Sequence, residues 1–198
     1  TLAKYRQAFT PRRAKDDPTD AEFAVDLLLR HSGRFKPLQP QSMEMRALSS
    51  LVEQRRSLVN DKIRITNRLR SAFKHYYPQV LDWFDHIDTP LFCDFIRHWP
   101  TLKQVKRARK NTLESFFNQH NMRFAQVLAD RLEAIKTATP LTTDDAIIIP
   151  YRLQALVLIE QLSVTLEGIK QFDQEIENIA CKHSDYPLFS ALPGAGPS

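Results

Sequence analysis

The 198-residue sequence has 28 lysine and arginine residues against 23 aspartate and glutamate residues, which gives a net charge of +5. Its composition, 42% hydrophobic and 26% charged, is typical of globular proteins and argues against an intrinsically disordered chain. The basic excess favours a polyanionic partner without identifying it. No uninterrupted apolar run approaches the ~18 residues of a membrane-spanning helix, so no membrane association is expected.

Few glycines and scattered prolines indicate a helical protein. The chain has only four glycines, whereas strand-rich folds use more of them in tight turns. The twelve prolines are then expected to separate helices. Cys93 and Cys181 have no metal-ligand spacing and indicate a reducing compartment.

The first helix is expected to begin at Asp17 and Pro18, because aspartate is a good N-cap and proline suits the first helical position. Gly33 should end it. Basic side chains directly precede this helix, at Arg12, Arg13 and Lys15. The helix therefore begins where charges of both signs are crowded together.

Asp17 and Asp20 support two interpretations. Their i, i+3 spacing places both carboxylates on one face of the first turn, where the helix dipole favours acids and a simple cap results. Two converging carboxylates can also hold Mg²⁺, which takes one or two protein carboxylates with phosphate oxygens and water. A two-metal phosphoryl-transfer site needs further acids, so this second interpretation requires ligands that the chain lacks.

Two long segments carry heptad patterns. Residues 42–76 contain neither Gly nor Pro and repeat Leu48, Val52, Val59, Thr66, Leu69, Phe73 and Tyr76. Arg55 and Lys62 interrupt that seam. Residues 144–183 repeat Ala155, Ile159, Leu162, Leu166, Ile169, Asp173, Ile176 and Ala180, so that Asp173 is the one polar break.

Charge favours pairing between the two long segments. Residues 42–76 have eight basic and three acidic residues, whereas residues 144–183 have three basic and seven acidic ones. Opposite charge beside matching apolar seams favours association. Residues 79–138 are divided into short amphipathic helices. The predicted fold class is therefore all-α: two long helices forming an antiparallel coiled-coil hairpin with a small helical insert at its tip. The same pairing could form between two chains.

The densest basic run is "KQVKRARK", residues 103–110. It has five cations and no acid: Lys103, Lys106, Arg107, Arg109 and Lys110. Such a run can bind nucleic-acid phosphates without reading sequence, or it can be a solvated helix face. A second basic set lies on the first long helix: Arg64, Arg68, Arg70, Lys74 and His75. Most of it is expected to flank the seam, and nucleic-acid contact is the alternative.

Three blocks, in order, resemble one transposase family. "AKDDPTDA" (14–21) resembles the Lys-x-Asp-x-x-Asp-Ala motif that ends the RuvC-like nuclease domain of the insertion-sequence family numbered one hundred and ten. "RALSSLVEQRRSLVNDKIRITNRLRSAF" (46–73) is similar to the family's following helix. "LFSALPGAGPS" (188–198) is similar to the Pro-Gly-x-Gly opening of its C-terminal transposase domain. The ordered set carries the resemblance, and residues 79–140 match only loosely.

The resemblance implies a site. In this family four acids of a DEDD set bind Mg²⁺ beside the scissile phosphate, and Asp17 and Asp20 match the last two. Lys15 matches the motif's lysine and is expected to contact nucleic acid. The other two acids would precede residue 1, and a serine nucleophile would follow residue 198. Asp16 replaces the motif's usual small polar residue, which leaves the site's geometry open.

The resemblance also implies an organisation. The expected parts are 1–33, the end of a RuvC-like nuclease domain; 34–78, a first coiled-coil helix; 79–140, a helical insert; 141–185, a second coiled-coil helix; and 186–198, the truncated start of a C-terminal transposase domain.

The expected parent is a bacterial or archaeal cytoplasmic, nucleoid-associated DNA transposase that cleaves and joins strands of a mobile element with Mg²⁺. Expected partners are DNA, a guide RNA, and a second copy of the chain through the coiled coil. The fragment alone is expected to be inactive. The alternatives are a stand-alone helical coiled-coil adaptor and a nucleic-acid-binding module without catalysis.

Overall fold

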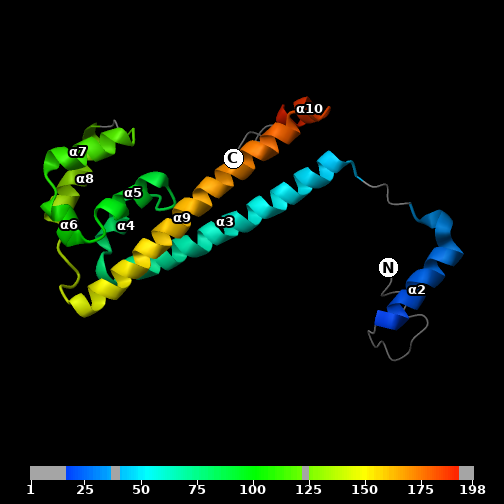
Figure 1. The fold of residues 1–198 in the computed structure, drawn as a ribbon, viewed down its shortest axis with the longest axis horizontal. Coiled ribbons are helices and arrows are strands. Elements are labelled where there is room, and N and C mark those ends of the chain that lie inside the picture. The colour runs from blue at the N-terminus through cyan, green and yellow to red at the C-terminus, as the bar shows by residue number, and fades with distance from the viewer. Residues whose placement is uncertain (1–16, 37–40, 122–124, 192–198) are drawn as a thin grey trace. The chain divides into compact units, whose positions relative to one another are not determined.

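The computed structural model describes residues 17–36, 41–121 and 125–191, and these ranges contain helices and connecting turns but no strand (Figure 1). The predicted all-α class is confirmed for this part of the chain. The described residues include several helices besides the two long ones, so the fold is more than a two-helix hairpin. The chain divides into two compact units, Thr1–Ser42 and Met43–Ser198.

The first unit contains helix α2 (Asp17–His31) and the 3₁₀ turn η1 (Ser32–Arg34). Helix α2 begins where the sequence predicts, with acids in its first turn and Arg30 and His31 in its last. This order of charges complements the helix dipole. Helix α2 has no buried residue, and Leu28 is 54% exposed. Its apolar side chains lack a covering layer among the described residues.

The second unit is built on two long helices, α3 (Met43–Tyr76) and α9 (Asp145–Ala180), which lie side by side (Figure 1). Near one end Arg55 forms an ion pair with Asp173. Near the other, the rings of His75 and Tyr151 stack with centroids 4.3 Å apart. Since α9 numbers fall as α3 numbers rise, the helices are antiparallel.

The polar residues that interrupt the two seams have partners. Arg55 of α3 meets Asp173 of α9, so the breaks in the two heptad patterns lie opposite one another. Lys62 pairs with Asp88 of the α4–α5 loop, at 2.8 Å between Nζ and Oδ2. Not all predicted seam positions are covered by α9: Val52 is 45% exposed, and Val59 and Thr66 line a hollow that α9 does not contribute to.

Short helices form the insert: α4 (Gln79–Trp83), α5 (Pro90–His98), α6 (Leu102–Arg107), α7 (Lys110–Gln119) and α8 (Ala125–Thr137). Thr89 and Thr101 cap α5 and α6, each hydroxyl accepting from a backbone N–H three residues on at 3.3 Å. Pro90 then fills the first position of α5, where no backbone donor is needed. These caps fix where α5 and α6 begin.

The hydrophobic core lies where the insert meets the hairpin. Phe95 of α5 is fully buried among aromatic rings, including those of Phe84 at 4.9 Å and Trp99 at 5.2 Å between centroids. The buried residues of α9 are Ala155, Leu158, Ile159 and Leu162, and those of α3 begin only at Thr66. The far halves of both helices therefore bury no side chain completely.

Helix α9 begins earlier than the regular heptad pattern. The carboxylate of Asp144 accepts from the Ala146 N–H at 2.9 Å, which caps the helix, and Pro150 is accommodated inside it. Among the described residues, α9 alone is long and apolar enough to cross a membrane by length and composition. Its four buried residues lie in the protein core, which accounts for part of that apolarity. A short helix, α10 (Tyr186–Ser190), follows.

Candidate functional site

The acidic pair lies at the start of α2. Asp17 is the first residue of the helix and is exposed, and Asp20 is partly buried. Both belong to the first turn, as their spacing predicts. The basic residues expected beside them, Arg12, Arg13 and Lys15, lie outside the described residues. The arrangement is compatible both with a dipole-stabilised cap and with two oxygen ligands for a cation.

The donor chemistry of this pair fits part of a Mg²⁺ site. Carboxylate oxygens are the ligands that Mg²⁺ prefers, and one or two of them suffice when phosphate and water complete the shell. Among the described residues, no group of three or more His, Cys, Asp or Glu side chains could hold a metal ion. Asp17 and Asp20 can therefore supply two ligands, and a complete site needs others.

The basic run 103–110 spans the turn between α6 and α7. Val105 is fully buried and anchors α6, while all five cations are exposed. The Lys106 ammonium donates to the Ala138 carbonyl at 2.6 Å, and Lys110 lies 3.6 Å from Glu114. Within the described part of the chain the other three cations of the run make no ion pair: Lys103, Arg107 and Arg109. Three positive charges are thus available to a phosphate backbone.

A groove of about 730 Å³ beside this run separates α6 and α7 from α8. Lys106, Lys110 and Lys136 line it, but so do three carboxylates, Glu114, Asp130 and Glu133, above an apolar floor. The mixed charge makes the groove a poor phosphate site. The useful positive charge of the insert therefore lies on the exposed turn rather than in the groove.

The second basic set does not share one face of α3, because Arg64 and Arg68 line a hollow with residues of α9 whereas Arg70 lines another hollow. Arg64 is tied to Asp61 of the same helix at 2.8 Å, between Nη2 and Oδ1. Arg68, Arg70 and Lys74 are exposed and have no ion pair within the described ranges. His75 instead stacks on Tyr151 of α9. Arg64, Arg68 and His75 lie beside α9, so most of this set flanks the seam, as the sequence predicts.

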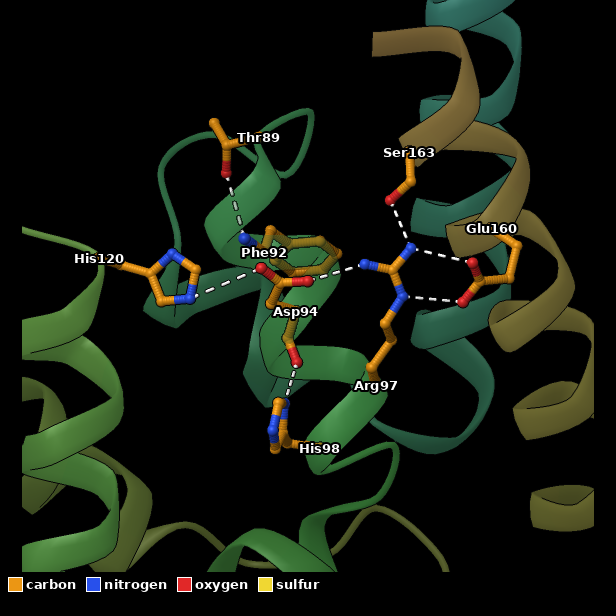
Figure 2. A network of polar contacts seen from close by, with 8 residues as sticks. All are labelled: Thr89, Phe92, Asp94, Arg97, His98, His120, Glu160 and Ser163. Atoms are coloured by element: carbon orange, nitrogen blue, oxygen red, sulfur yellow. Dashed lines mark hydrogen bonds and ion pairs between the residues drawn. The ribbon is translucent and has the colours of Figure 1, made fainter. Parts of the chain in front are cut away.

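A polar network that the sequence does not predict joins the insert to α9 (Figure 2). Arg97 of α5 donates to both oxygens of Glu160, at 2.8 and 2.9 Å, and to the Ser163 hydroxyl at 2.6 Å. These hydrogen bonds raise the pKa of Arg97 and lower that of Glu160. Arg97 also contacts Asp94 at 2.7 Å, whose other oxygen lies 3.6 Å from His120. The network fixes the insert on the hairpin.

Comparison with known sequences gives one family match. Residues 1–78 match the model of the IS110 DEDD transposase family, described as "Transposase". This matched range contains Asp17, Asp20 and the whole of α3. No solved structure matches the chain.

Three curated relatives extend the match. The mini-circle putative transposase for IS117 of Streptomyces coelicolor is 25% identical over 98% of this chain and 48% of its own length. The putative transposase y4uE of Sinorhizobium fredii is 28% identical over 62% of this chain and 34% of its own. An uncharacterized 44.8 kDa protein of the insertion element IS116 of Streptomyces clavuligerus is 24% identical over 92% and 45%. The chain thus spans half or less of each relative.

Proposed function

We propose, from the premise that this chain belongs to the IS110 family of DEDD transposases, that it joins the catalytic parts of a DNA transposase and binds nucleic acid between them. The proposal is supported by the part of the chain that the family match covers. The family match covers residues 1–78, so it includes the acidic pair of α2 and the long helix α3, and the IS117 relative covers 98% of the chain.

Asp17 and Asp20 would contribute two of the ligands for a divalent cation, Mg²⁺ in our proposal. Bound there, the cation would neutralise charge on a scissile phosphate during strand cleavage and joining. The two carboxylates would hold the cation at the N-terminal end of α2. Because a two-metal site needs more acids than the described residues bring together, we expect the 198 residues alone to be inactive.

The insert would contact DNA, or a guide RNA, through the turn between α6 and α7. Lys103, Arg107 and Arg109 support this role, because they are exposed and without ion pairs in the described part of the chain. Contacts of this kind position a backbone and carry affinity without reading bases.

The hairpin would also bring two copies of the chain together. The side of α9 opposite its buried residues carries exposed apolar side chains at intervals of four and seven, here called the α9 outer stripe: Ile149, Leu153, Val157 and Val164. A row of exposed apolar side chains along one side of a helix marks an interaction site, and a second copy of the chain is the occupant we propose.

The cellular setting follows from the same premise. A transposase that acts on chromosomal DNA would work in the bacterial cytoplasm, at the nucleoid. The second candidate function is a nucleic-acid-binding helical module without catalysis, which the exposed cap-like position of Asp17 favours.

The proposal is tested by measuring binding of fluorescent DNA and RNA by the 198-residue chain across a range of salt concentrations. Replacing Lys103, Arg107 and Arg109 by alanine should weaken binding and lower the salt slope by about two to three. A charge-matched control replaces the exposed Lys36, Lys170 and Lys182. Equal losses in both triple variants, or no binding by the parent chain, would contradict the proposal.

A further inference from the structure

The solvent face of α3 carries a row of exposed residues at alternating intervals of four and three, here called the α3 polar stripe. It consists of Arg56, Asn60, Ile63, Asn67, Arg70 and Lys74. Residues with this spacing form a continuous line on one side of a helix. From Arg56 to Arg70 the line extends about 21 Å at 1.5 Å per residue. It contains three cations, two amides and no acid.

The cations of the stripe are available to bind a ligand. Arg56, Arg70 and Lys74 make no ion pair within the described ranges, in contrast to Arg55 and Arg64 of the same helix, which each pair with an aspartate. A helix that is stabilised by its own charges would pair them at i, i+4, and this stripe does not. Unpaired cations interleaved with amide donors are suited to phosphate groups.

A hollow of about 410 Å³ opens beside the middle of the stripe. Val59 and Ile63 give it an apolar wall, and Asn67 and Arg70 lie at its polar side. Its one carboxylate belongs to Asp88, which is already paired with Lys62 at 2.8 Å. The hydrogen bond from Lys62 lowers the pKa of Asp88, so this carboxylate remains charged and neutralised by its partner.

Thr66 supplies an independent sign that the hollow has a ligand. The residue lines the hollow, is only 9% exposed, and its hydroxyl has no hydrogen-bond partner. A buried polar group without a partner costs stability, and such groups are uncommon in native proteins. A ligand with a polar edge beside a flat apolar face would satisfy the hydroxyl while it covers Val59 and Ile63.

We propose that the α3 polar stripe binds single-stranded nucleic acid, with Arg56, Arg70 and Lys74 on its phosphate groups and one unstacked nucleotide in the hollow beside Thr66. A base offers both a flat apolar face and a hydrogen-bonding edge, which is what this wall and these polar groups can recognise. A strand paired along its whole length cannot place a base there. This inference rests on the proposed nucleic-acid function but assigns it a second surface, separate from the insert.

The test compares Thr66→Val with the parent chain in binding to labelled single-stranded RNA, single-stranded DNA and duplex DNA. Valine keeps the shape of threonine and removes only the hydroxyl, so the fold should be retained, as circular dichroism and urea unfolding would verify. Single-strand binding should weaken about three- to tenfold, the loss expected for one hydrogen bond. Thr165→Val on α9, whose hydroxyl bonds to the Gln161 carbonyl at 2.7 Å, is the matched control.

Arg70→Gln provides a second measurement. It should weaken single-strand binding and lower the salt slope by about 0.7, as expected for one lost phosphate contact, whereas Arg46→Gln, exposed on α3 but outside the stripe, should not. Whichever single strand, RNA or DNA, loses more affinity on Thr66→Val is identified as the ligand. Unchanged single-strand binding in both Thr66→Val and Arg70→Gln, or tighter binding of duplex than of single strands, would overturn the inference. If the insert variants alone reduce binding, the proposed function stands and this inference fails.

Discussion

Arg97 and Glu160 form a two-point ion pair between α5 and α9, although 63 residues separate them in the chain (Figure 2). The planar guanidinium matches the carboxylate, with Nε–Oε1 at 2.8 Å and Nη2–Oε2 at 2.9 Å. Ser163 accepts a further hydrogen bond from the same guanidinium at 2.6 Å. This geometry ties the insert to the hairpin at one orientation, which places the basic turn of α6 and α7.

The first prediction concerns the pH dependence of this pair. Arg97 lowers the pKa of Glu160 below its ordinary value of 4.5, so the stabilisation is fully present above that value and is lost as the pH falls through the lower folded-state pKa. Since the Glu160 side chain is 62% exposed, Glu160→Gln should cost only about 0.5–1 kcal/mol at neutral pH. Urea unfolding should show this difference shrinking below pH ~4.5.

The control for this prediction is Glu167→Gln, which removes an exposed carboxylate from the same helix without an ion pair among the described residues. Its effect on the free energy of unfolding should not depend on the presence of Arg97. A Glu160→Gln cost that stays constant from neutral to acidic pH would show that the pair contributes no charge interaction.

The second prediction concerns the contact between α3 and α9. Gly168 lies inside α9, and a Cβ added there would meet Leu58 Cδ1 of α3 at 3.5 Å, an ordinary van der Waals distance. Gly168→Ala should therefore raise the free energy of unfolding by about 0.5–1 kcal/mol, because alanine loses less conformational entropy in a helix. Thermal unfolding by circular dichroism measures the change.

Gly33→Ala is the matched control for that variant. Nothing lies within 4 Å of its added Cβ, and the residue is in the turn η1 rather than in an α-helix. Gly33→Ala should raise the free energy of unfolding by less than Gly168→Ala does. A loss of stability at Gly168 would mean that the two long helices pack more closely there than an added methyl group allows.

The pairing of α3 with α9 shows what the sequence could predict. The heptad spacing identified both helices, and their opposite charges identified each as the other's partner. The register was not predictable, because it depends on which residues meet across 118 positions of sequence, as Arg55 and Asp173 do. Val52 fits the heptad equally well yet is exposed, since periodicity alone does not say which of two adjacent apolar lines is covered.

The residues of the Arg97 network could not be found from sequence. Arg97, Glu160 and Ser163 have no local motif, and their contacts exist only once the insert has folded onto α9. Residues 103–110 were a stronger signal, because five cations without an acid stand out in any conformation. The metal interpretation of Asp17 and Asp20 stays a prediction, since it requires groups other than those the structure describes.

The third prediction tests oligomerisation through the α9 outer stripe. Val157 is 59% exposed near the middle of that stripe, so Val157→Glu would place a charge in an interface between two copies. Sedimentation should then show a shift from dimer toward monomer. Gln154→Glu introduces the same charge at an exposed position of α9 outside the stripe and should leave the mass unchanged. A parent chain that sediments as a monomer at all concentrations would contradict the proposed self-association.

The last prediction separates a metal site from a helix cap at Asp17 and Asp20. If the pair binds a cation, Asp17→Asn with Asp20→Asn should weaken the binding of Mn²⁺, used as a probe for Mg²⁺, because amides keep the shape but lose the charge that a hard cation requires. If the carboxylates serve only as a cap, asparagine should substitute well, since it caps helices about as effectively as aspartate. Electron paramagnetic resonance of free Mn²⁺ measures binding, and circular dichroism measures helicity. The control is the double variant Glu22→Gln with Asp145→Asn, which removes two exposed carboxylates that do not belong to the proposed site. Equal Mn²⁺ binding by the parent chain and the Asp17/Asp20 variant would exclude a contribution of this pair to metal binding.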